Sequence, residues 1–238
     1  LGVTRQAILN IPGLSAFLPE YTPFLCRDTV AARQAGAVAG WGRKRSMRQA
    51  DRLAARHDLP ALCLEDGFLR SVDFLAEGKN PPLSLVADRQ GIYFDATQPS
   101  LLETWLNTHV FSADALERAR RCMAAIVENR LSKYNNGRMY SCQSLGLSRH
   151  TRKVLIVDQC YGDASLVYGG ADRGTFSDMI ACARTLFPDA ELVIKTHPDV
   201  IRGRRKGYLR SYFGASDVRV ISSDVNPHVL FDTVEAVF

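Results

Sequence analysis

Two short apolar runs in this 238-residue sequence end in polar residues of types that catalyse reactions and bind phosphates. The first run ends at Asp158, and the turn after it carries Asp163. The second ends at Lys195, and His197 follows two residues later. A carboxylate beside the anomeric carbon of a sugar can act as a nucleophile and a second one as an acid or base. An imidazole and an ammonium group suit a phosphate. These residues therefore form one candidate site.

Asp158 and His197 also have structural interpretations, since a lone histidine more often has a structural role. Asp158, at the end of its run, can cap nearby backbone amides. Asp163 lies deeper in the loop and is the stronger candidate for chemistry, because Gly162 lets the loop turn sharply and approach a ligand. Pro198 would fix the turn that presents His197.

A further pair of carboxylates follows an earlier apolar run. Glu65 and Asp66 come directly after the segment 61–64, and Arg70 lies four residues beyond Asp66. One interpretation is a catalytic or acceptor-binding carboxylate at the end of a strand. The other is a salt bridge to Arg70 that fixes the loop. The sequence leaves both open.

The residues that could do chemistry lie where predicted strands end. The segments 35–42, 43–57 and 61–64 are typical of a strand, a helix and a strand, which implies a parallel sheet. The second half repeats this alternation, with strands expected at 153–158, 191–195, 218–222 and from Ala236, and helices over 175–187 and near Asn226. In open α/β sheets, ligands bind where the carboxyl ends of strands meet their loops. The sequence therefore predicts an α/β protein with its site at such an edge.

The middle of the chain predicts several other elements. The segments 83–88 and 91–95 flank a short turn and are typical of a hairpin or two short strands. Pro99 opens a helix, and Ser112 is expected to cap a longer one that reaches about Arg130. The longer helix has an apolar face formed by Leu116, Ala119, Met123, Ile126 and Val127.

Two domains are expected, 1–140 and 150–238, because the stretch 135–151 between them is polar and rich in turn residues. The sequence ends as the strand from Ala236 begins. The second half is therefore expected to be incomplete at its C-terminus.

The formal charge of +5 and the pI near 9.0 indicate an anionic partner, such as a nucleotide phosphate, an acidic sugar or an anionic membrane surface. Nucleic acid is not expected, because the charge is spread along the chain and no nucleic-acid-binding motif occurs. One basic cluster either faces an anionic substrate or lipid or forms a solvated face; it consists of Arg202, Arg204, Arg205 and Lys206. Sequence fingerprints of P-loop ATPases and NAD enzymes are absent.

The six cysteines include no CxxC pair and predict reduced thiols of a cytoplasmic protein. No Cys or His pair has the spacing of zinc ligands, so no metal is expected. No apolar run approaches the ~20 residues that a membrane span needs.

Taken in order, several stretches resemble the bacterial capsule polysaccharide Kdo transferases of the KpsC type. They are Ile11-Pro-Gly-Leu14, Trp41-Gly42, Leu64-Glu-Asp-Gly-Phe-Leu-Arg-Ser71, Pro81-Pro-Leu-Ser-Leu85, Gly91-Ile-Tyr-Phe-Asp95, Leu131-Ser-Lys-Tyr-Asn135, Val157-Asp-Gln-Cys-Tyr-Gly-Asp-Ala-Ser165 and Lys195-Thr-His-Pro-Asp199. They span nearly the whole chain, so the resemblance is far more specific than any one motif.

The resemblance implies a glycosyltransferase that moves 3-deoxy-manno-octulosonic acid (Kdo) from CMP-Kdo to a phospholipid-linked Kdo acceptor. The product is the β-linked Kdo linker on which an exported capsule is assembled. The implied fold is similar to the GT-B arrangement of two Rossmann-like halves, with the acceptor on the first half and the donor nucleotide on the second. Such a protein would be cytoplasmic and peripheral to the inner membrane, with the membrane surface and the capsule export machinery as partners. CMP-Kdo would be its donor substrate, with no separate cofactor.

The resemblance also assigns donor-binding residues. His197 and Pro198 match the family's HP element, which contacts the CMP moiety in CMP-sugar transferases. Lys195, Arg70 and Ser165 are expected to help bind the donor. An HP-type CMP site does not require a metal ion.

Catalytic roles follow from the same resemblance. Asp163 matches the loop aspartate expected at the reacting centre. Because the family retains the anomeric configuration of the donor, Asp163 is the expected nucleophile of a covalent Kdo–carboxylate intermediate. Glu65 or Asp66 is the candidate acid/base on the acceptor side, and Asp158 is a further catalytic candidate.

The sequence departs from the family pattern at its end. Family members continue past the position of Phe238 into a Ser-rich turn and a helix that complete the CMP site, and they usually carry two such modules. This chain alone is therefore expected to bind the donor poorly and to turn over little of it. The alternatives are a non-catalytic capsule assembly or export factor and a transferase for another CMP-sugar, such as sialic acid.

Overall fold

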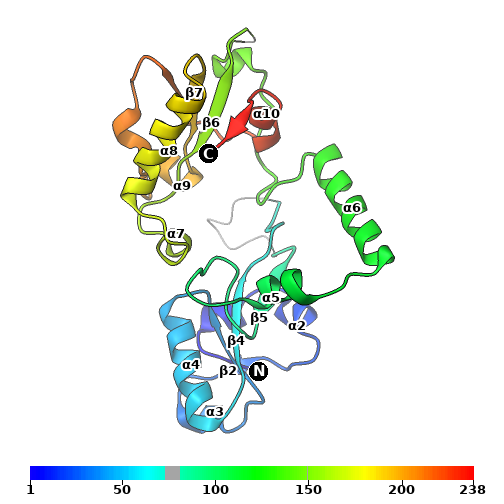
Figure 1. The fold of residues 1–238 in the computed structure, drawn as a ribbon. Helices are drawn as coiled ribbons and strands as arrows, with labels where there is room; N and C mark the ends of the chain where they lie inside the picture. Colours follow the sequence, from blue (N-terminus) through cyan, green and yellow to red (C-terminus); the bar gives the residue numbers. More distant parts are fainter. Residues whose placement is uncertain (73–80, 149) are drawn as a thin grey trace. The chain divides into compact units, whose positions relative to one another are not determined.

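A computed structural model of the chain describes residues 1–72, 81–148 and 150–238. The chain divides into two compact units, each with its own sheet (Figure 1). One comprises Leu1–Ile126 and Lys133–Asn135, and the other Val127–Ser132 and Asn136–Phe238. The stretch predicted to separate two domains lies mostly in the second unit. Its apolar side chains pack on that unit's core, notably Tyr140, Cys142, Leu145 and Leu147.

The sheet of the first unit has the strand order β2-β1-β3-β4-β5. Its strands are β1 (Gly2–Val3), β2 (Phe24–Leu25), β3 (Val38–Trp41), β4 (Ala61–Asp66) and β5 (Leu85–Asp88). The first four pair in parallel, and β5 runs antiparallel to β4. The predicted strand–helix–strand unit is confirmed as β3, α4 (Arg45–His57) and β4.

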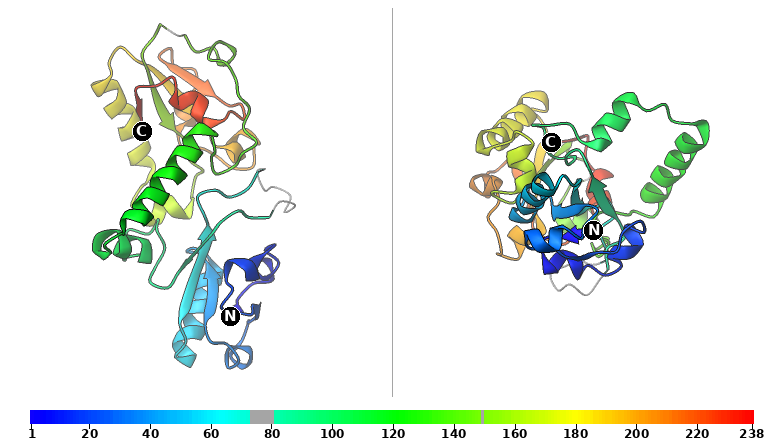
Figure 2. Two further views of the ribbon diagram at one scale, coloured as in Figure 1. Left: turned by 90° about the vertical axis from the view of Figure 1, so that its right-hand side faces the viewer. Right: turned by 90° about the horizontal axis from the view of Figure 1, so that it is seen from below.

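The two faces of this sheet are covered by different helices. Buried side chains of β3 and β4 alternate, so that Ala39 and Leu64 contribute to one cluster and Val38 and Cys63 to the other. The short helices α1 (Gln6–Leu9) and α2 (Leu14–Phe17) cover the first face, and α3 (Thr29–Ala32) and α4 cover the second (Figure 2, left). Gly40 lets α4 approach β3, because a Cβ there would lie 2.3 Å from the Cα of Met47.

The sheet of the second unit is fully parallel, with the order β8-β7-β6-β9. Its strands are β6 (Lys153–Val157), β7 (Glu191–Lys195), β8 (Val218–Ile221) and β9 (Ala236–Val237). On one face, α8 (Arg173–Leu186) buries Phe176, Ile180 and Ala183. On the other, α10 (Pro227–Phe231) buries Val229 and Leu230. These elements confirm the alternation predicted for the second half.

Strand order reverses at one point in each sheet. In the first unit, the chain leaves β1 for β2 on one side and then returns to β3 on the other. In the second unit, β7 and β8 lie on one side of β6, and β9 lies on the other. Loops that leave such neighbouring strands in opposite directions open a crevice, which is where open α/β sheets bind ligands. The carboxyl ends of β1 and β3, and of β6 and β9, are therefore the expected ligand sites.

The predicted strand over 91–95 is wrong. This segment forms turns, and β5 pairs with β4 instead of with it. The reason lies in two carboxylates that bind the local backbone amides a strand partner would otherwise bind. Asp88 Oδ1 accepts hydrogen bonds from the amides of Gln90 and Gly91 at 2.7 and 2.9 Å, and Asp95 Oδ1 accepts one from Thr97 at 2.9 Å.

The helices predicted from Pro99 and Ser112 are present as α5 (Leu101–Thr108) and α6 (Ala113–Glu128). The apolar face of α6 is not buried against the described residues. Leu116, Met123 and Val127 are 45%, 59% and 63% exposed, and α6 contributes to none of the buried clusters. Among the described residues, no helix is long and apolar enough to cross a membrane.

The remaining elements are short and were not expected individually. They are α7 (Ala164–Tyr168), α9 (Pro198–Ile201) and two 3₁₀ turns, Gln143–Leu145 and Leu209–Tyr212. The two-residue strands β1 and β2 are too short to show a period-2 pattern in the sequence.

Candidate functional site

Asp158 lies directly after β6 and is buried, with only 1% of its surface exposed. Its Oδ1 accepts hydrogen bonds from the amides of Gln159, Tyr208 and Leu209 at 2.9, 2.9 and 3.2 Å. Burial raises the pKa of Asp158 despite these hydrogen bonds. The carboxylate thus ties the end of β6 to the segment 207–209.

Gly207 is required by this arrangement. A Cβ at that position would lie 2.0 Å from Asp158 Oδ2, so only glycine lets the backbone pass the carboxylate. Gly207 also forms an isolated bridge with Cys160. Asp158 therefore binds backbone amides and supports the loop, as its structural interpretation expected.

Asp163 has a different environment, because it is the N-cap of α7. Its Oδ1 accepts hydrogen bonds from both the amide and the hydroxyl of Ser165, at 2.9 and 2.8 Å. Its Oδ2 lies 3.8 Å from Arg205 Nη1, and the side chain is 40% exposed. Burial alone would raise the pKa of Asp163, but Ser165, Arg205 and His197 together hold it below the usual value. This carboxylate is ionised at neutral pH and belongs to a partly exposed side chain.

The loop after β6 is fixed by the segment that carries the basic cluster. Arg205 Nη2 donates to the carbonyl oxygen of Tyr161 at 3.4 Å, and the amide of Tyr161 donates to the carbonyl of Lys206 at 2.7 Å. The amide of Gly162 donates to the hydroxyl of Tyr208 at 3.3 Å. The basic cluster is therefore not a uniform solvated face, since Arg205 faces Asp163.

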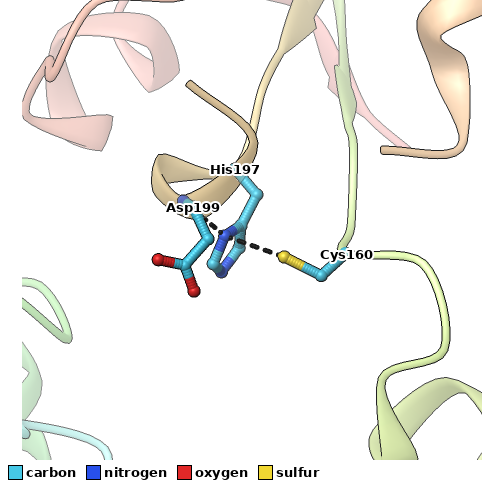
Figure 3. Close-up of side chains that lie close together, drawn as sticks. All are labelled: Cys160, His197 and Asp199. Carbon is cyan, nitrogen blue, oxygen red and sulfur yellow. Dashed lines mark hydrogen bonds between the residues drawn. The ribbon is translucent and has the colours of Figure 1, made fainter. Parts of the chain in front are cut away.

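His197 follows β7 and uses Nδ1 as a hydrogen-bond acceptor (Figure 3). The amide of Asp199 donates to Nδ1 at 3.1 Å, and Cys160 Sγ lies 3.1 Å from the same nitrogen. A backbone N–H can only donate, so Nδ1 carries no proton and a neutral ring is protonated at Nε2. Burial is the main cause that lowers the pKa of His197. His197 is thus a neutral imidazole with an Nε2–H donor.

Cys160, His197 and Asp199 also present three potential metal-ligand atoms within 4.8 Å of one another (Figure 3). They come from loops after two strands, so a search for ligand spacing in the sequence does not find them. Nδ1 of His197 already accepts the amide of Asp199, and burial raises the pKa of the Cys160 thiol. A hydrogen-bonded nitrogen and a protonated thiol are poor metal ligands.

Lys195 is the last residue of β7 and is half-buried. Its Nζ donates to the carbonyl oxygen of Thr196 at 2.8 Å. Burial lowers the pKa of Lys195 to about 8, although the charge of Asp224 acts in the opposite direction. The register that pairs Val157 with Lys195 brings the ends of β6 and β7 to the same edge, as predicted.

In the first unit, Glu65 accepts a hydrogen bond from the indole of Trp41. Trp41 Nε1 donates to Glu65 Oε1 at 2.8 Å, and the amide of Asp66 donates to the same oxygen at 3.0 Å. Burial raises the pKa of Glu65 and outweighs these hydrogen bonds. Gly42 lies against the carboxylate, because a Cβ there would come within 2.5 Å of Glu65 Oε2. A carboxyl group with a raised pKa suits general acid/base chemistry.

Asp66 and Arg70 form an ion pair, which is the salt bridge that was one of the two interpretations of this segment. Glu65 takes no part in it. Arg70 also lines a cavity of about 410 Å³, together with Ile8, Ile11 and Trp41. Of the two adjacent carboxylates, Glu65 is therefore the one whose charge no guanidinium neutralises at close range among the described residues.

Three contacts of the candidate residues were not predicted: Cys160 with His197 and Arg205 with Asp163 in the second unit, and Trp41 with Glu65 in the first. The partners are 37, 42 and 24 residues apart in the sequence. Only the pairing of strands determines which loops meet, so no local signal could have found them. The predicted residues Asp158, Asp163, Lys195 and His197 do gather at the carboxyl edge of the second sheet, whereas Arg70 lies in the first unit.

A profile of the family described as "Capsule polysaccharide biosynthesis protein" matches residues 36–238. The chain belongs to this family. Two curated relatives, both called "Capsule polysaccharide modification protein LipA", come from Neisseria meningitidis serogroups B and A. Each is 38% identical over 238 residues, which is 99% of this chain and 33% of the relative. The "Lipopolysaccharide-processing protein LpsZ" of Rhizobium meliloti is 39% identical over 204 residues, 85% of this chain and 46% of that protein.

Solved structures place the chain among KpsC-type capsule polysaccharide proteins. The β-Kdo 2,4 transferase of Thermosulfurimonas dismutans KpsC is 40% identical, with a TM-score of 0.88 over 99% of this chain and 72% of that chain. The β-Kdo 2,7 transferase of the same protein is 25% identical, with a TM-score of 0.56 over 97% of this chain and 64% of that chain. The predicted family is confirmed. The chain spans one third of the length of its meningococcal relatives.

Proposed function

We propose that this capsule polysaccharide biosynthesis protein is part of a retaining glycosyltransferase, which moves Kdo from CMP-Kdo to a lipid-linked Kdo acceptor. The observation that carries the proposal is the Asp163 carboxylate at the carboxyl edge of the second sheet. One of its oxygens is held by Ser165, and the other lies beside Arg205 in a side chain that is 40% exposed. An ionised carboxylate oriented in this way suits attack on an anomeric carbon. The 40% identity to a β-Kdo 2,4 transferase supports the choice of Kdo.

The first chemical step would form a covalent intermediate. Asp163 Oδ2 attacks the anomeric carbon of CMP-Kdo, the bond from that carbon to the phosphate oxygen breaks, and CMP leaves with the bonding electron pair. Arg205 keeps Asp163 ionised before the attack. Nothing has to protonate the leaving group, because a phosphate oxygen leaves readily as an anion.

The second step would transfer Kdo to the acceptor with net retention of configuration. The acceptor hydroxyl attacks the anomeric carbon, the bond to Asp163 breaks, and Glu65 takes the hydroxyl proton. We assign this role to Glu65 instead of Asp66, because Asp66 is ion-paired with Arg70. The raised pKa of Glu65 makes it a stronger base than an ordinary glutamate once it is ionised.

The donor nucleotide would bind through His197 and Lys195. The Nε2–H of His197 donates to the CMP phosphate, and the Lys195 ammonium supplies charge. The segment that begins at Pro198 holds this orientation, since the amide of Asp199 fixes Nδ1. We assign Ser165 to the support of Asp163, because both its amide and its hydroxyl bind that carboxylate. Arg70 is reassigned to the acceptor side, because it lies in the first unit.

The wider setting follows the family. We infer a GT-B-like pair of Rossmann-like halves in which the first binds the acceptor and the second binds the CMP-sugar without a metal ion. The enzyme would act in the cytoplasm at the inner-membrane surface, in concert with capsule export. The parallel strand order β8-β7-β6-β9 supports the Rossmann-like assignment, because it is the order 3-2-1-4 when the strands of this sheet are numbered along the chain.

A transfer assay tests the proposal. The whole protein is incubated with CMP-Kdo, generated in situ, and a lipid-linked Kdo acceptor, with CMP-sialic acid as the competing donor. We expect Kdo addition, abolished in Asp163→Asn and strongly reduced in His197→Ala. A non-catalytic assembly factor would add no Kdo, and its Asp163→Asn variant would still support capsule production in cells. Preferential transfer of sialic acid would contradict the assignment of Kdo.

A further inference from the structure

A second cavity of the first unit is lined by arginine side chains. It has a volume of about 660 Å³, and its charged lining consists of Arg5, Arg27, Arg45 and Arg52, with Asp28 as the only acidic residue among those described. Gln49 and Thr29 add polar side chains. A concave surface of this size can enclose most of a sugar or a phosphate-bearing head group.

The cavity lies at the edge of the sheet where a ligand is expected. Arg5 follows β1, Arg27 follows β2, and Arg45 opens the helix after β3. The neighbouring cavity that contains Trp41 is bordered by two of the same residues, Arg5 and Arg45. The two cavities therefore adjoin beside the point where strand order reverses between β1 and β3.

The positive charge of this cavity exceeds its negative charge, with four guanidinium groups against the one carboxylate of Asp28 among the described residues. Within residues 1–72, 81–148 and 150–238, none of its four guanidinium groups forms an ion pair. Asp28 is already engaged as the N-cap of α3, where Oδ1 accepts the amides of Val30 and Ala31 at 3.0 and 2.9 Å. By contrast, Arg43 and Arg70 of the same unit are paired with Asp95 and Asp66.

Four unpaired guanidinium groups around one concave surface repel one another and raise the local potential. The planar fork of arginine binds carboxylates and phosphates through two parallel hydrogen bonds. An anion in the cavity would relieve the repulsion and satisfy these donors. A neutral sugar would accept hydrogen bonds from these donors but would not relieve the repulsion.

We propose that this cavity binds an anionic group of the acceptor, either the carboxylate of an acidic sugar or the phosphate of its lipid carrier. Arg5 and Arg45 would link that group to the Trp41 cavity beside Glu65, where the reacting sugar would sit. The inference rests on the proposed function, because it takes the first unit as the acceptor side.

Direct binding measurements test the inference without any transfer step. The whole protein is titrated by calorimetry with a soluble Kdo disaccharide, and by flotation with vesicles that contain phosphatidylglycerol. The variant Arg27→Gln/Arg52→Gln changes two residues that line only this cavity. The matched control is Arg56→Gln, an exposed arginine one helical turn beyond Arg52 that does not line it.

We expect the double variant to bind one of the two ligands at least about tenfold more weakly, because each charge-assisted hydrogen bond is worth about that factor. Loss of disaccharide binding would identify a carboxylate, and loss of vesicle binding alone would identify a phosphate. The control should bind both as the unaltered protein does. Equal affinity of variant and unaltered protein for both ligands, or binding of neither by the unaltered protein, would overturn the inference.

Failure of the proposed function would look different. Attachment of Kdo to Asp163 needs only the donor. The Arg27→Gln/Arg52→Gln variant should therefore still form the covalent Kdo–Asp163 intermediate. A protein that binds the disaccharide through these arginines but never labels Asp163 would keep the inference of an acidic-glycan site and refute the proposed transfer.

Discussion

Oδ2 of Asp163 lies 3.8 Å from Nη1 of Arg205, while its Oδ1 is held by Ser165. The two residues are 42 positions apart and meet because the loop after β6 is tied to the segment that follows α9. Both hydrogen bonds from Ser165 go to Oδ1, so Oδ2 of this partly exposed side chain lies beside Arg205 and is oriented by the bonds to Oδ1. This environment separates Asp163 from Asp158, whose carboxylate is buried.

Replacing Arg205 should change the pH dependence of transfer. Arg205 contributes to the lowered pKa of Asp163, so Arg205→Gln should raise that pKa. Because the nucleophile must be ionised, activity falls as the pH drops through this pKa, and the acid limb of the kcat profile should move to higher pH. Arg204→Gln, an exposed neighbour, is the control and should leave the limb in place. An unshifted limb in Arg205→Gln would show that the contact does not tune Asp163.

Glu65→Gln should reduce transfer by about a hundredfold or more, as expected for loss of a general base. Trp41→Phe removes the indole N–H that stabilises the ionised form of Glu65. The pKa of Glu65 should then rise further, and the pH at which the base becomes active should rise with it. Trp105→Phe, at an exposed position on α5, should have no such effect. A Glu65→Gln variant with full activity would shift the role to another residue.

Binding of CMP should weaken as the pH rises through about 8, because Lys195 loses its charge there. Bound phosphate will raise this pKa somewhat, since it favours the charged form. Lys195→Arg keeps its charge at all these pH values, so its affinity should stay flat between pH 7 and 9.5. Lys206→Arg, in the basic cluster, should follow the unaltered protein. Titration calorimetry with the whole protein measures the CMP affinity of all three proteins at each pH. An affinity of the unaltered protein that does not change with pH would refute the role of Lys195.

Asp158 and Gly207 should matter for stability. Asp158→Ala leaves one buried and two partly buried amides without their acceptor and should lower the free energy of unfolding by about 3 kcal/mol. Gly207→Ala should also destabilise, because its Cβ would overlap Asp158 Oδ2. Asp163→Ala loses an N-cap, worth about 1 kcal/mol, and an exposed contact with Arg205 that adds at most about as much. Urea denaturation compares the three. Equal costs at Asp158 and Asp163 would contradict the supporting role of Asp158.

The sequence predicted the elements whose patterns are local. The apolar runs of β6 and β7 and the helical spacing of Met47, Ala50 and Leu53 in α4 each show their period within one segment. The segment 91–95 misled because Ile92, Tyr93 and Phe94 are residues typical of a strand, while carboxylates of Asp88 and Asp95 bind the local amides.

The site was predictable in part for the same reason. The positions of Asp163 and His197 after strands are visible in the sequence, and so is the glycine before Asp163. The contacts that tune them are not visible, because Cys160 and Arg205 meet their partners only through the register of β6 and β7. The exposed apolar face of α6 was likewise unpredictable, since an amphipathic pattern shows that a face is apolar without showing what covers it.

The most direct test of the central claim is mass spectrometry of the Glu65→Gln variant of the whole protein after incubation with CMP-Kdo. Without its base, the second step should slow while the first proceeds, so the covalent intermediate should accumulate. We predict a mass increase of one Kdo residue, located at Asp163 in the peptide that contains α7 and absent from Asp163→Asn/Glu65→Gln. Turnover of CMP-Kdo with no label on Asp163, or a label on another residue, would contradict the assignment of Asp163 as the nucleophile.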